Sequence, residues 1–351
     1  MEQLQAALAG LSLTEIEKLL LPLPRFRAAQ IYKWIEKGAL SFEEMTNIPV
    51  SMQKELRERF RLFSGAAAGC YDDAGTKKIV VALKDGAKAE AVLLSDGKKR
   101  LTACLSTQAG CPAGCVFCKT GSLGFSRNLD GAEIVEQFIF LRNAEKRNAE
   151  EKDGRVIGNI VVMGMGEPLL NLENLRKAIA VFTDKQGMNF SRRRITVSTC
   201  GICGGLFDIA ENGPYIRLAL SLTTADEELR QKLMPVTNSN PLRTVKEALA
   251  LFQRNGGGRV TLEVPLLGGV NTRDADARSI AGFAEGMDTV VNIIPWNPVA
   301  GLEFEGRPLR EPGKKETQDF VRMLESLGLK VTMRLHKGRR VMGACGQLGT
   351  L

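Results

Sequence analysis

Short β-rich runs alternate with helical stretches from Arg100 onward, and this alternation constrains the fold more than any other feature. Candidate strands cover 100–105, 159–163, 194–198, 216–221, 260–265, 289–294 and 330–334. Helical patterns fit between them at 131–143, 172–183, 226–233, 242–255, 275–285 and 315–327. This order predicts parallel strands joined by crossover helices. Six or seven such units predict an α/β fold, an open or partial TIM-like barrel with active groups at the carboxyl ends of its strands.

The residues before the barrel predict two smaller regions. Apolar residues recur at helical spacing in 11–21, 27–35 and 51–60, with Thr14 as an expected N-cap. The segments 78–83 and 89–94 predict a hairpin around Lys84-Asp85-Gly86. We therefore expect a helical accessory domain at 1–64, a small β linker at 65–96, the barrel at 97–335 and a tail at 336–351. The basic residues of the helical domain either form an ordinary solvated surface or bind RNA.

Composition narrows the class of protein. The chain has 351 residues, of which 44% are hydrophobic, so a sizeable core is expected. A net charge of +8 favours polyanionic partners such as nucleic acid, although many basic proteins bind none. The N-terminus has no secretory pattern and no apolar run approaches the roughly 18 residues of a membrane span, which predicts a cytoplasmic protein without a membrane partner. Eight cysteines are too sparse for a disulfide scaffold.

Three of those cysteines, Cys111, Cys115 and Cys118, lie in one short loop just after the first barrel strand. Thiolates favour iron–sulfur clusters, zinc or cuprous copper. A cubane cluster normally takes four cysteines, so three predict a [4Fe-4S] cluster with one iron left open to hold and cleave a small molecule. Zinc would need a fourth protein ligand. The nearest candidate, Cys104, lies on the expected strand, so the spacing favours the iron–sulfur cluster.

Two motifs together resemble the radical S-adenosylmethionine (SAM) superfamily. The first is Cys-x-x-x-Cys-x-x-Cys after the first barrel strand. The second is Gly164-Met-Gly-Glu-Pro168 after the second strand, which resembles the motif that holds the SAM amino group. Glycines there let the backbone approach a ligand closely, and Glu167 is suited to accept hydrogen bonds from an ammonium group.

Longer motifs narrow the resemblance to the RlmN/Cfr family, radical SAM methyltransferases that act on adenosine in ribosomal and transfer RNA. They are Leu-Thr-Ala-Cys-Leu-Ser-Thr-Gln-Ala-Gly-Cys (101–111), Gly-Phe-Ser-Arg-Asn-Leu (124–129), Gly-Glu-Pro-Leu-Leu-Asn (166–171), Ile-Pro-Trp-Asn (294–297) and Ala-Cys-Gly-Gln-Leu (344–348). The likeness covers nearly the whole chain. The motifs at 166–171 and 294–297 look more like the branch that methylates carbon 2 of adenine, and carbon 8 remains the alternative.

The resemblance implies a reaction with two SAM molecules and a [4Fe-4S] cluster. Carbon 2 of adenine is electron-poor and has no lone pair, so it cannot act as the nucleophile that takes a methyl group directly from SAM. One SAM is implied to methylate a cysteine, and the second to yield a radical that takes hydrogen from that methyl group. The resulting carbon radical adds to adenine, and a second cysteine releases the product and leaves a disulfide. The cofactor supplies the difficult chemistry and the protein supplies orientation.

Specific residues carry over from the family pattern. Cys345 matches the methyl carrier, Cys104 the resolving cysteine and Glu90 the proton acceptor. Strand alternation places Cys104 on one face with Thr102 and Ser106. The expected cluster ligands are Cys111, Cys115 and Cys118, and the expected SAM contacts are Gly166, Glu167, Ser198, Ser221, Leu222, Thr223 and Asn297.

The chain departs from the family pattern at two places. Thr223 stands where the family usually has histidine, and basic residues at 339–340 replace acidic ones in the tail. Cys200 and Cys203 fit two small residues at a strand-to-helix turn better than a redox pair. His336, the chain's single histidine, fits a surface or packing role. Basic clusters at 98–100, 192–194 and 337–340 are candidates for RNA phosphate contacts, or else solvated surface, and several of them are expected to flank the active face.

The resemblance also implies partners. These are 23S ribosomal RNA and transfer RNA, an external flavodoxin-like electron donor and a disulfide reductant, with the chain acting as a monomer. A radical SAM enzyme acting on a peptide or small molecule would keep the cysteine triad but would have no use for Cys104 and Cys345. A non-catalytic iron–sulfur or zinc module that binds RNA would form no deoxyadenosine from SAM.

Overall fold

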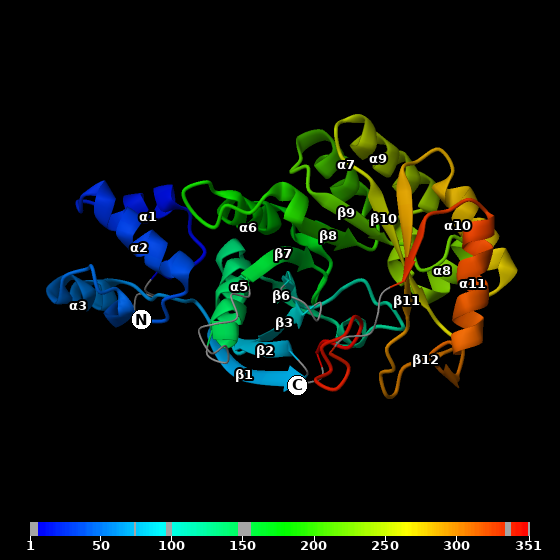
Figure 1. Cartoon of the computed structure of the whole chain (residues 1–351), viewed down its shortest axis with the longest axis horizontal. Helices are drawn as coiled ribbons and strands as arrows, with labels where there is room; N and C mark the ends of the chain where they lie inside the picture. The colour runs from blue at the N-terminus through cyan, green and yellow to red at the C-terminus, as the bar shows by residue number, and fades with distance from the viewer. Residues whose placement is uncertain (1–5, 74, 96–99, 147–155, 334–337, 350–351) are drawn as a thin grey trace.

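The computed structural model describes residues 6–73, 75–95, 100–146, 156–333 and 338–349. Within them, a curved ten-stranded sheet has the order β1-β2-β3-β4-β7-β8-β9-β10-β11-β14, with helices on its outer face (Figure 1). Strands β1 and β14 are its two edges in the described part of the chain, so the barrel is open there. The expected α/β architecture, a partial barrel, is confirmed.

The strands from β4 onward run parallel, as the alternating pattern predicts. They are β4 (Arg100–Cys104), β7 (Val156–Val162), β8 (Ile195–Thr199), β9 (Arg217–Ser221), β10 (Val260–Leu266), β11 (Thr289–Pro295) and β14 (Val331–Met333). The helices between them are α5 (Gly131–Lys146), α6 (Leu172–Thr183), α7 (Cys203–Asn212), α8 (Glu227–Leu233), α9 (Leu242–Arg254), α10 (Asp274–Ala284) and α11 (Lys314–Ser326). Helix α7 is not among the helices expected from the sequence.

Three antiparallel strands extend this sheet beyond β4. They are β1 (Ala66–Asp73), β2 (Thr76–Ala82) and β3 (Lys88–Ser95). The predicted hairpin is β2–β3, and β3 pairs in turn with β4. The sequence gives no signal for β1, because six of its eight residues are exposed and alanine, glycine and aspartate dominate it.

The N-terminal helices form a separate module at one end of the long axis (Figure 1). They are α1 (Leu13–Leu19), α2 (Arg25–Lys37), the 3₁₀ turn η1 (Phe42–Glu44) and α3 (Val50–Arg59). The expected Thr14 cap is wrong, because Thr14 already lies inside α1 and Ser12 is the N-cap. The Ser12 hydroxyl accepts the Glu15 N–H, while the Glu15 carboxylate accepts the Ser12 N–H at 2.8 Å. This capping box satisfies two helix-end groups at once.

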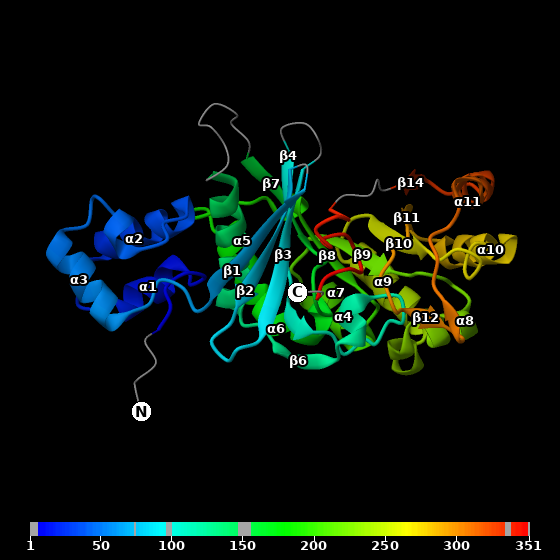
Figure 2. The same ribbon diagram turned by 90° about the horizontal axis from the view of Figure 1, so that it is seen from below.

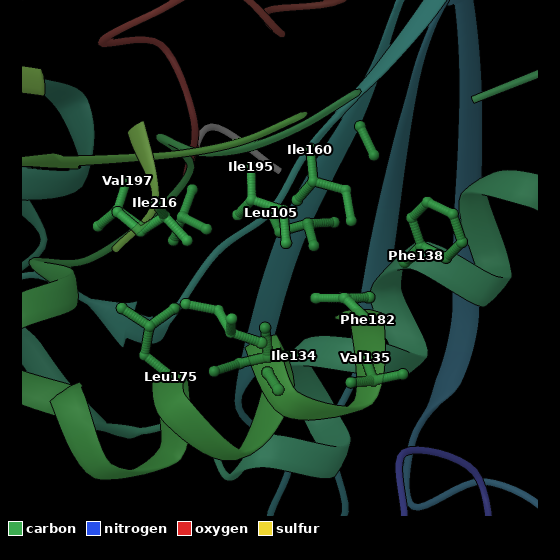
Figure 3. Packing of buried hydrophobic residues seen from close by; sticks show 14 of the residues in the cluster. Leu105, Ile134, Val135, Phe138, Ile160, Leu175, Phe182, Ile195, Val197 and Ile216 are labelled. Atoms are coloured by element: carbon green, nitrogen blue, oxygen red, sulfur yellow. The ribbon is translucent and has the colours of Figure 1, made fainter. Parts of the chain in front are cut away.

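The two faces of the barrel sheet differ in polarity because strand residues alternate in direction. Outward-facing side chains such as Ile160, Ile195 and Val197 pack with Phe138 of α5 and Phe182 of α6 (Figure 3). Each such fully buried side chain contributes roughly 1.5–3 kcal/mol. The inward face carries polar residues instead, including Thr102, Thr196, Ser198, Ser221, Thr261, Glu263 and Asn292. Because these side chains are polar, the inner face is suited to binding and catalysis rather than to hydrophobic packing.

Short elements complete the carboxyl end of the barrel. They are β5 (Gln108–Gly110), α4 (Lys119–Ser122), β6 (Phe125–Asn128), η2 (Pro168–Asn171), η4 (Pro235–Ser239), β12 (Glu303–Phe304) and β13 (Arg307–Pro308). The 3₁₀ turn η3 (Arg192–Arg194) lies instead at the amino end, just before β8. The C-terminal tail, residues 338–349, lies beside α4 (Figure 2). No helix in the described ranges is long and apolar enough to cross a membrane.

Candidate active site

The cysteine loop is held at the carboxyl end of the strands by main-chain and apolar contacts. It runs from Cys111 after β5 to Cys118 before α4. The Val116 N–H donates to the Leu233 carbonyl, and the Trp296 indole N–H donates to the Phe117 carbonyl at 2.9 Å. All three cysteines pack against one apolar cluster that includes Phe117 and Trp296. The fold of this loop therefore brings three thiols together in one apolar environment.

Burial makes these thiols poor acids without a cationic partner. It raises the pKa of Cys111 to about 12, and it raises the pKa values of Cys115 and Cys118 as well. Cys118 as a like-charged neighbour also raises the pKa of Cys111 and of Cys115, which shows that the thiols lie close together. Such thiols ionise readily only when a metal binds them.

The donor set fits an iron–sulfur cluster. In the part of the chain that the structure describes, no three His, Cys, Asp or Glu side chains converge on a single ion. A cubane needs no such convergence, because each cysteine binds a different iron. Three soft thiolates in an apolar loop therefore match three irons of a cubane and leave the fourth iron for another ligand.

The turn after β7 approaches β5 so closely that Gly166 has no room for a side chain. Gly166 has φ of +100°, and a Cβ there would lie 2.5 Å from the Gln108 side chain. The Glu167 N–H donates to the Gln108 amide oxygen at 2.8 Å. The buried Glu167 carboxylate accepts the main-chain N–H groups of Cys200, at 2.7 Å, and Leu169, at 2.9 Å. Burial raises the pKa of Glu167.

The expected SAM contacts on β8 and β9 lie together. The hydroxyl oxygens of Ser198 and Ser221 are 3.1 Å apart. Leu222 is fully buried, and its N–H donates to the Glu263 carbonyl. Thr223 has φ of +63°, an uncommon backbone conformation for a β-branched residue, and its buried hydroxyl has no hydrogen-bond partner within the described residues. This orphaned hydroxyl stands where the family usually has histidine.

A buried arginine that the sequence pattern did not single out connects these segments. Arg230 of α8 is 0% exposed. Its guanidinium donates to the carbonyls of Leu222, at 3.0 Å, and Cys200, at 2.7 Å, and to the Thr237 hydroxyl at 2.6 Å. Its positive charge opposes the rise in the pKa of Cys115. Only its helical spacing with the buried Leu233 hinted at an inward position.

The C-terminal tail crosses the carboxyl end of the barrel and carries Cys345 into it. The Asn297 amide donates to the Cys345 carbonyl at 3.1 Å, and the Thr120 hydroxyl donates to the Leu348 carbonyl at 2.7 Å. The pKa of Cys118 is raised by burial above all and also by Cys345, which places the two thiols near each other. Cys345 therefore lies beside the cysteine loop.

The same tail reaches Cys104 and Glu90. Leu348 packs with Cys104, Val92 and Met165 in one small apolar cluster. Cys104 on β4 pairs with Val92 on β3, so Glu90, two residues away, shares its sheet face. The Gly349 N–H donates to the Glu90 carboxylate at 3.0 Å. The end of the tail thus contacts a residue 259 positions earlier in the chain, on the sheet face that carries Cys104.

Lys78 of β2 is a second site residue that the sequence pattern did not single out. It is 0% exposed, and its ammonium lies 3.3 Å from the Glu90 carboxylate and 3.3 Å from the Met342 carbonyl of the tail. Burial lowers the pKa of Lys78. In a half-buried strand, a lysine is expected on the solvent-facing side. The inward position of Lys78 becomes evident only from the tertiary fold.

Other expected positions lie elsewhere. Cys200 follows β8 and Cys203 begins α7, with both thiols free, as expected for a strand-to-helix turn. The basic residues at 192–194 form η3 just before β8, at the opposite end of the strands from the cysteine loop. This cluster is therefore not one of those that flank the active face. His336, Lys98, Lys99 and Lys337 lie outside the described residues.

Comparisons with known proteins agree with this geometry. Residues 105–278 match the radical SAM superfamily, and residues 7–62 match the ribosomal RNA large subunit methyltransferase N-terminal domain. The probable dual-specificity RNA methyltransferase RlmN of Treponema denticola is 45% identical, over 99% of this chain and 96% of that protein. The probable dual-specificity RNA methyltransferase RlmN of Thermus thermophilus is 41% identical, over 93% of this chain and 90% of that protein. A radical SAM methyltransferase structure from Sphaerobacter thermophilus matches with a TM-score of 0.90 and 34% identity, over 97% of this chain and 98% of that one.

Proposed function

Because this chain belongs to the RlmN family of radical SAM RNA methyltransferases, we propose that it methylates carbon 2 of adenosine in 23S ribosomal RNA and transfer RNA. A [4Fe-4S] cluster and SAM are its cofactors. The observation that carries the proposal is the docked tail, which holds Cys345 beside the cysteine loop while Leu348 packs on Cys104. A radical enzyme acting on a small molecule needs no such pair of cysteines.

Cys111, Cys115 and Cys118 would hold three irons of the cluster, and the open iron would take SAM. When bound, the cluster and SAM supply a carbon-centred radical by reductive cleavage. The SAM contacts would come from the turns and strand ends that surround the cysteine loop: Gly166, Glu167, Ser198, Ser221, Leu222, Thr223 and Asn297. This assignment of SAM contacts is supported by the proximity of these residues to one another at the carboxyl ends of β7, β8, β9 and β11, where barrel ligands bind.

Cys345 would carry the methyl group, because its half-buried position in a glycine-flanked tail suits a thiol that serves successive steps. Cys104 would resolve the covalent RNA adduct by attacking the Cys345 sulfur. Glu90 would accept the proton lost from adenine carbon 2, with Lys78 holding its carboxylate in place. The apolar cluster around Cys104 excludes water from these steps.

Each turnover would leave a Cys104–Cys345 disulfide, so two electrons must be returned before the next. A disulfide reductant and a flavodoxin-like electron donor are the corresponding partners. We propose that the chain works as a monomer in the cytoplasm, where its RNA substrates are. Residues 1–64 would be the RNA-binding accessory domain, 65–96 a linker, 97–335 the catalytic barrel and 336–351 the catalytic tail.

The test is nucleoside mass spectrometry of RNA treated with the reconstituted protein and SAM, against carbon-2 and carbon-8 methyladenosine standards. We expect 2-methyladenosine from the wild type and none from Cys345→Ala. Cys203→Ala is the matched control, because Cys203 lies outside the proposed cysteine pair, and it should retain methylation. Methylated adenosine from Cys345→Ala would refute the assignment, and 8-methyladenosine from the wild type would move the chain to the other branch.

A further inference from the structure

The lumen of the barrel contains a cavity of about 1060 Å³. Every parallel strand from β4 to β14 contributes to its lining, as does β3. A cavity at the upper end of the usual size range for ligand pockets has room for more than one ring system. The chemistry of its two ends therefore indicates what enters it.

The inner end of the cavity reaches the proposed chemistry. Leu94, Val161 and Met163 line the cavity. The same three side chains pack against the apolar cluster that contains Cys104 and Leu348. A group that occupies this end of the lumen thus lies next to the resolving cysteine.

The outer end lies at the amino ends of the strands and is strongly basic. Arg193 lies in η3, two residues before β8, Arg217 begins β9, and Arg259 directly precedes β10. Arg193 and Arg217 are exposed, and their side chains make no hydrogen bond or ion pair with any residue that the structure describes. Arg259 pairs with the exposed Asp288 at 2.9 Å, a surface contact worth about 0–1 kcal/mol. Two guanidinium groups are therefore available to an anionic ligand, and the third is held only by this weak surface pair.

Apart from Asp288, which pairs with Arg259, the acidic side chain nearest this end lies deeper in the cavity. Glu263, the acidic side chain among the described lining residues, is 7% exposed and accepts a hydrogen bond from the Asn292 amide at 2.7 Å. It lies on β10 opposite Ser221, four positions further along the strand than Arg259. The positive charge thus stays at the mouth, and the carboxylate stays deeper in the lumen.

An aromatic ring and a glycine run share the mouth with these arginines. Tyr215, which is 37% exposed, lines the cavity just before β9. Gly256 and Gly258 line it just before β10, where the backbone is open to close approach. Guanidinium groups bind phosphates, and exposed aromatic rings stack on bases, which together is the chemistry of single-stranded nucleic acid binding.

We propose that Arg193, Arg217, Arg259 and Tyr215 form an RNA entry site at the amino end of the barrel. This inference rests on the proposed function. The arginines hold phosphates on either side of the target adenosine, and the unstacked base enters the lumen toward Cys104. The cysteine loop and the docked tail cover the carboxyl end, so the base approaches from the opposite end. Arginines spread over three neighbouring strands favour an extended polyanion over a single small anion.

The test measures RNA affinity as a function of salt, using the full chain and an RNA stem–loop with the target adenosine in its loop. For Arg193→Gln/Arg217→Gln we expect about tenfold weaker binding, and a plot of log affinity against log salt shallower by about 1.4, because each lost contact to a single strand removes about 0.7. The matched control is Arg278→Gln/Lys315→Gln, which removes equal charge from exposed positions on α10 and α11. It should bind RNA within about twofold of the wild type.

Three further variants separate the effect of charge from that of the aromatic ring. Arg193→Lys/Arg217→Lys keeps the charges and should recover the wild-type salt slope, while Tyr215→Ala should weaken binding several-fold and Tyr215→Phe should not. SAM affinity should be unchanged in all variants. If wild-type protein methylates the RNA and Arg193→Gln/Arg217→Gln binds it with unchanged affinity and slope, the entry site is wrong. A wild-type protein that methylates no RNA would instead contradict the proposed function.

Discussion

At the scale of single residues, the Lys78–Glu90 pair links the sheet to the tail. Both side chains are at most 2% exposed, and the Lys78 ammonium also donates to the Met342 carbonyl. Removing one partner of such a buried pair leaves an unpaired charge and typically costs about 3–5 kcal/mol. The pair therefore holds Glu90 in place only as long as both charges are present.

We expect Lys78→Met and Glu90→Gln each to destabilise the fold by about 3 kcal/mol or more. The double variant should cost less than the sum by about 1–3 kcal/mol, because neither leaves the other's charge unpaired. Urea denaturation of the four proteins measures this coupling. Additive effects would mean that the two groups do not interact in solution.

Arg230 gives a second prediction at this scale. Its buried positive charge lies close enough to Cys115 to lower the pKa of that thiol, and a buried cation favours the more negative, reduced state of a cluster bound there. Arg230→Gln should therefore lower the reduction potential of the reconstituted cluster by on the order of tens of millivolts. A redox titration followed by electron paramagnetic resonance measures the shift. Arg278→Gln is the control, since that exposed arginine lies on α10, and a potential equal to the wild type in Arg230→Gln would exclude this electrostatic role.

At the scale of elements, the tail is a short segment that hydrogen bonds and one small apolar cluster hold against the barrel. Leu348 is 5% exposed and supplies its main apolar contact, against Cys104 and its neighbours. Removing a buried leucine side chain costs about 2–5 kcal/mol, and in a segment this short the cost falls on docking rather than on the whole fold.

Leu348→Ala should therefore expose Cys345 more often. We expect the alkylation rate of Cys345 to rise by about thirtyfold or more, since that factor corresponds to about 2 kcal/mol of lost docking energy. Mass spectrometry after iodoacetamide treatment reads the rate, and the exposed Cys70 is an internal reference in the same molecule. Equal ratios of the two rates in both proteins would show that Leu348 does not hold the tail.

The elements were predictable where local pattern and burial agree. Helix α6 occupies Leu172–Thr183, the range that its apolar spacing predicts, because one face is buried and the other is wet. Strand β1 escaped prediction because it has little buried surface, and the Thr14 cap was wrong because Ser12 and Glu15 together satisfy more groups. Lys78 and Arg230 could not be predicted, because both act from inward positions that only distant segments create.

At the scale of the whole molecule, the barrel has two chemically different ends. The carboxyl end carries the cysteine loop and the tail, and the amino end carries the arginines of the proposed RNA entry site. The helical module packs against α5 and the turn after α6, where the Tyr32 hydroxyl donates to Asp184 at 3.2 Å (Figure 1). The stability of the joint between this module and the barrel therefore affects the binding of any RNA that contacts both.

One carboxyl group at that joint makes it sensitive to pH. Glu136 of α5 is 0% exposed and accepts the N–H groups of Ser64 and Gly65, where the module meets the sheet. Burial raises the pKa of Glu136 from its ordinary 4.5 to about 7, although these hydrogen bonds oppose the rise. The folded protein thus binds this proton more tightly than the unfolded chain does.

Stability from this group is consequently greatest below pH 4.5 and declines as pH rises through about 7. A shift of this size corresponds to on the order of 3 kcal/mol between those limits. Urea denaturation from pH 5 to pH 8.5 should show the wild type losing stability relative to Glu136→Gln, whose side chain does not titrate. The difference between the two proteins should level off above pH 8, where Glu136 is ionised in both the folded and the unfolded state. Parallel curves across the range would show that the carboxylate is already ionised in the folded protein at pH 5, with the hydrogen bonds from Ser64 and Gly65 outweighing burial.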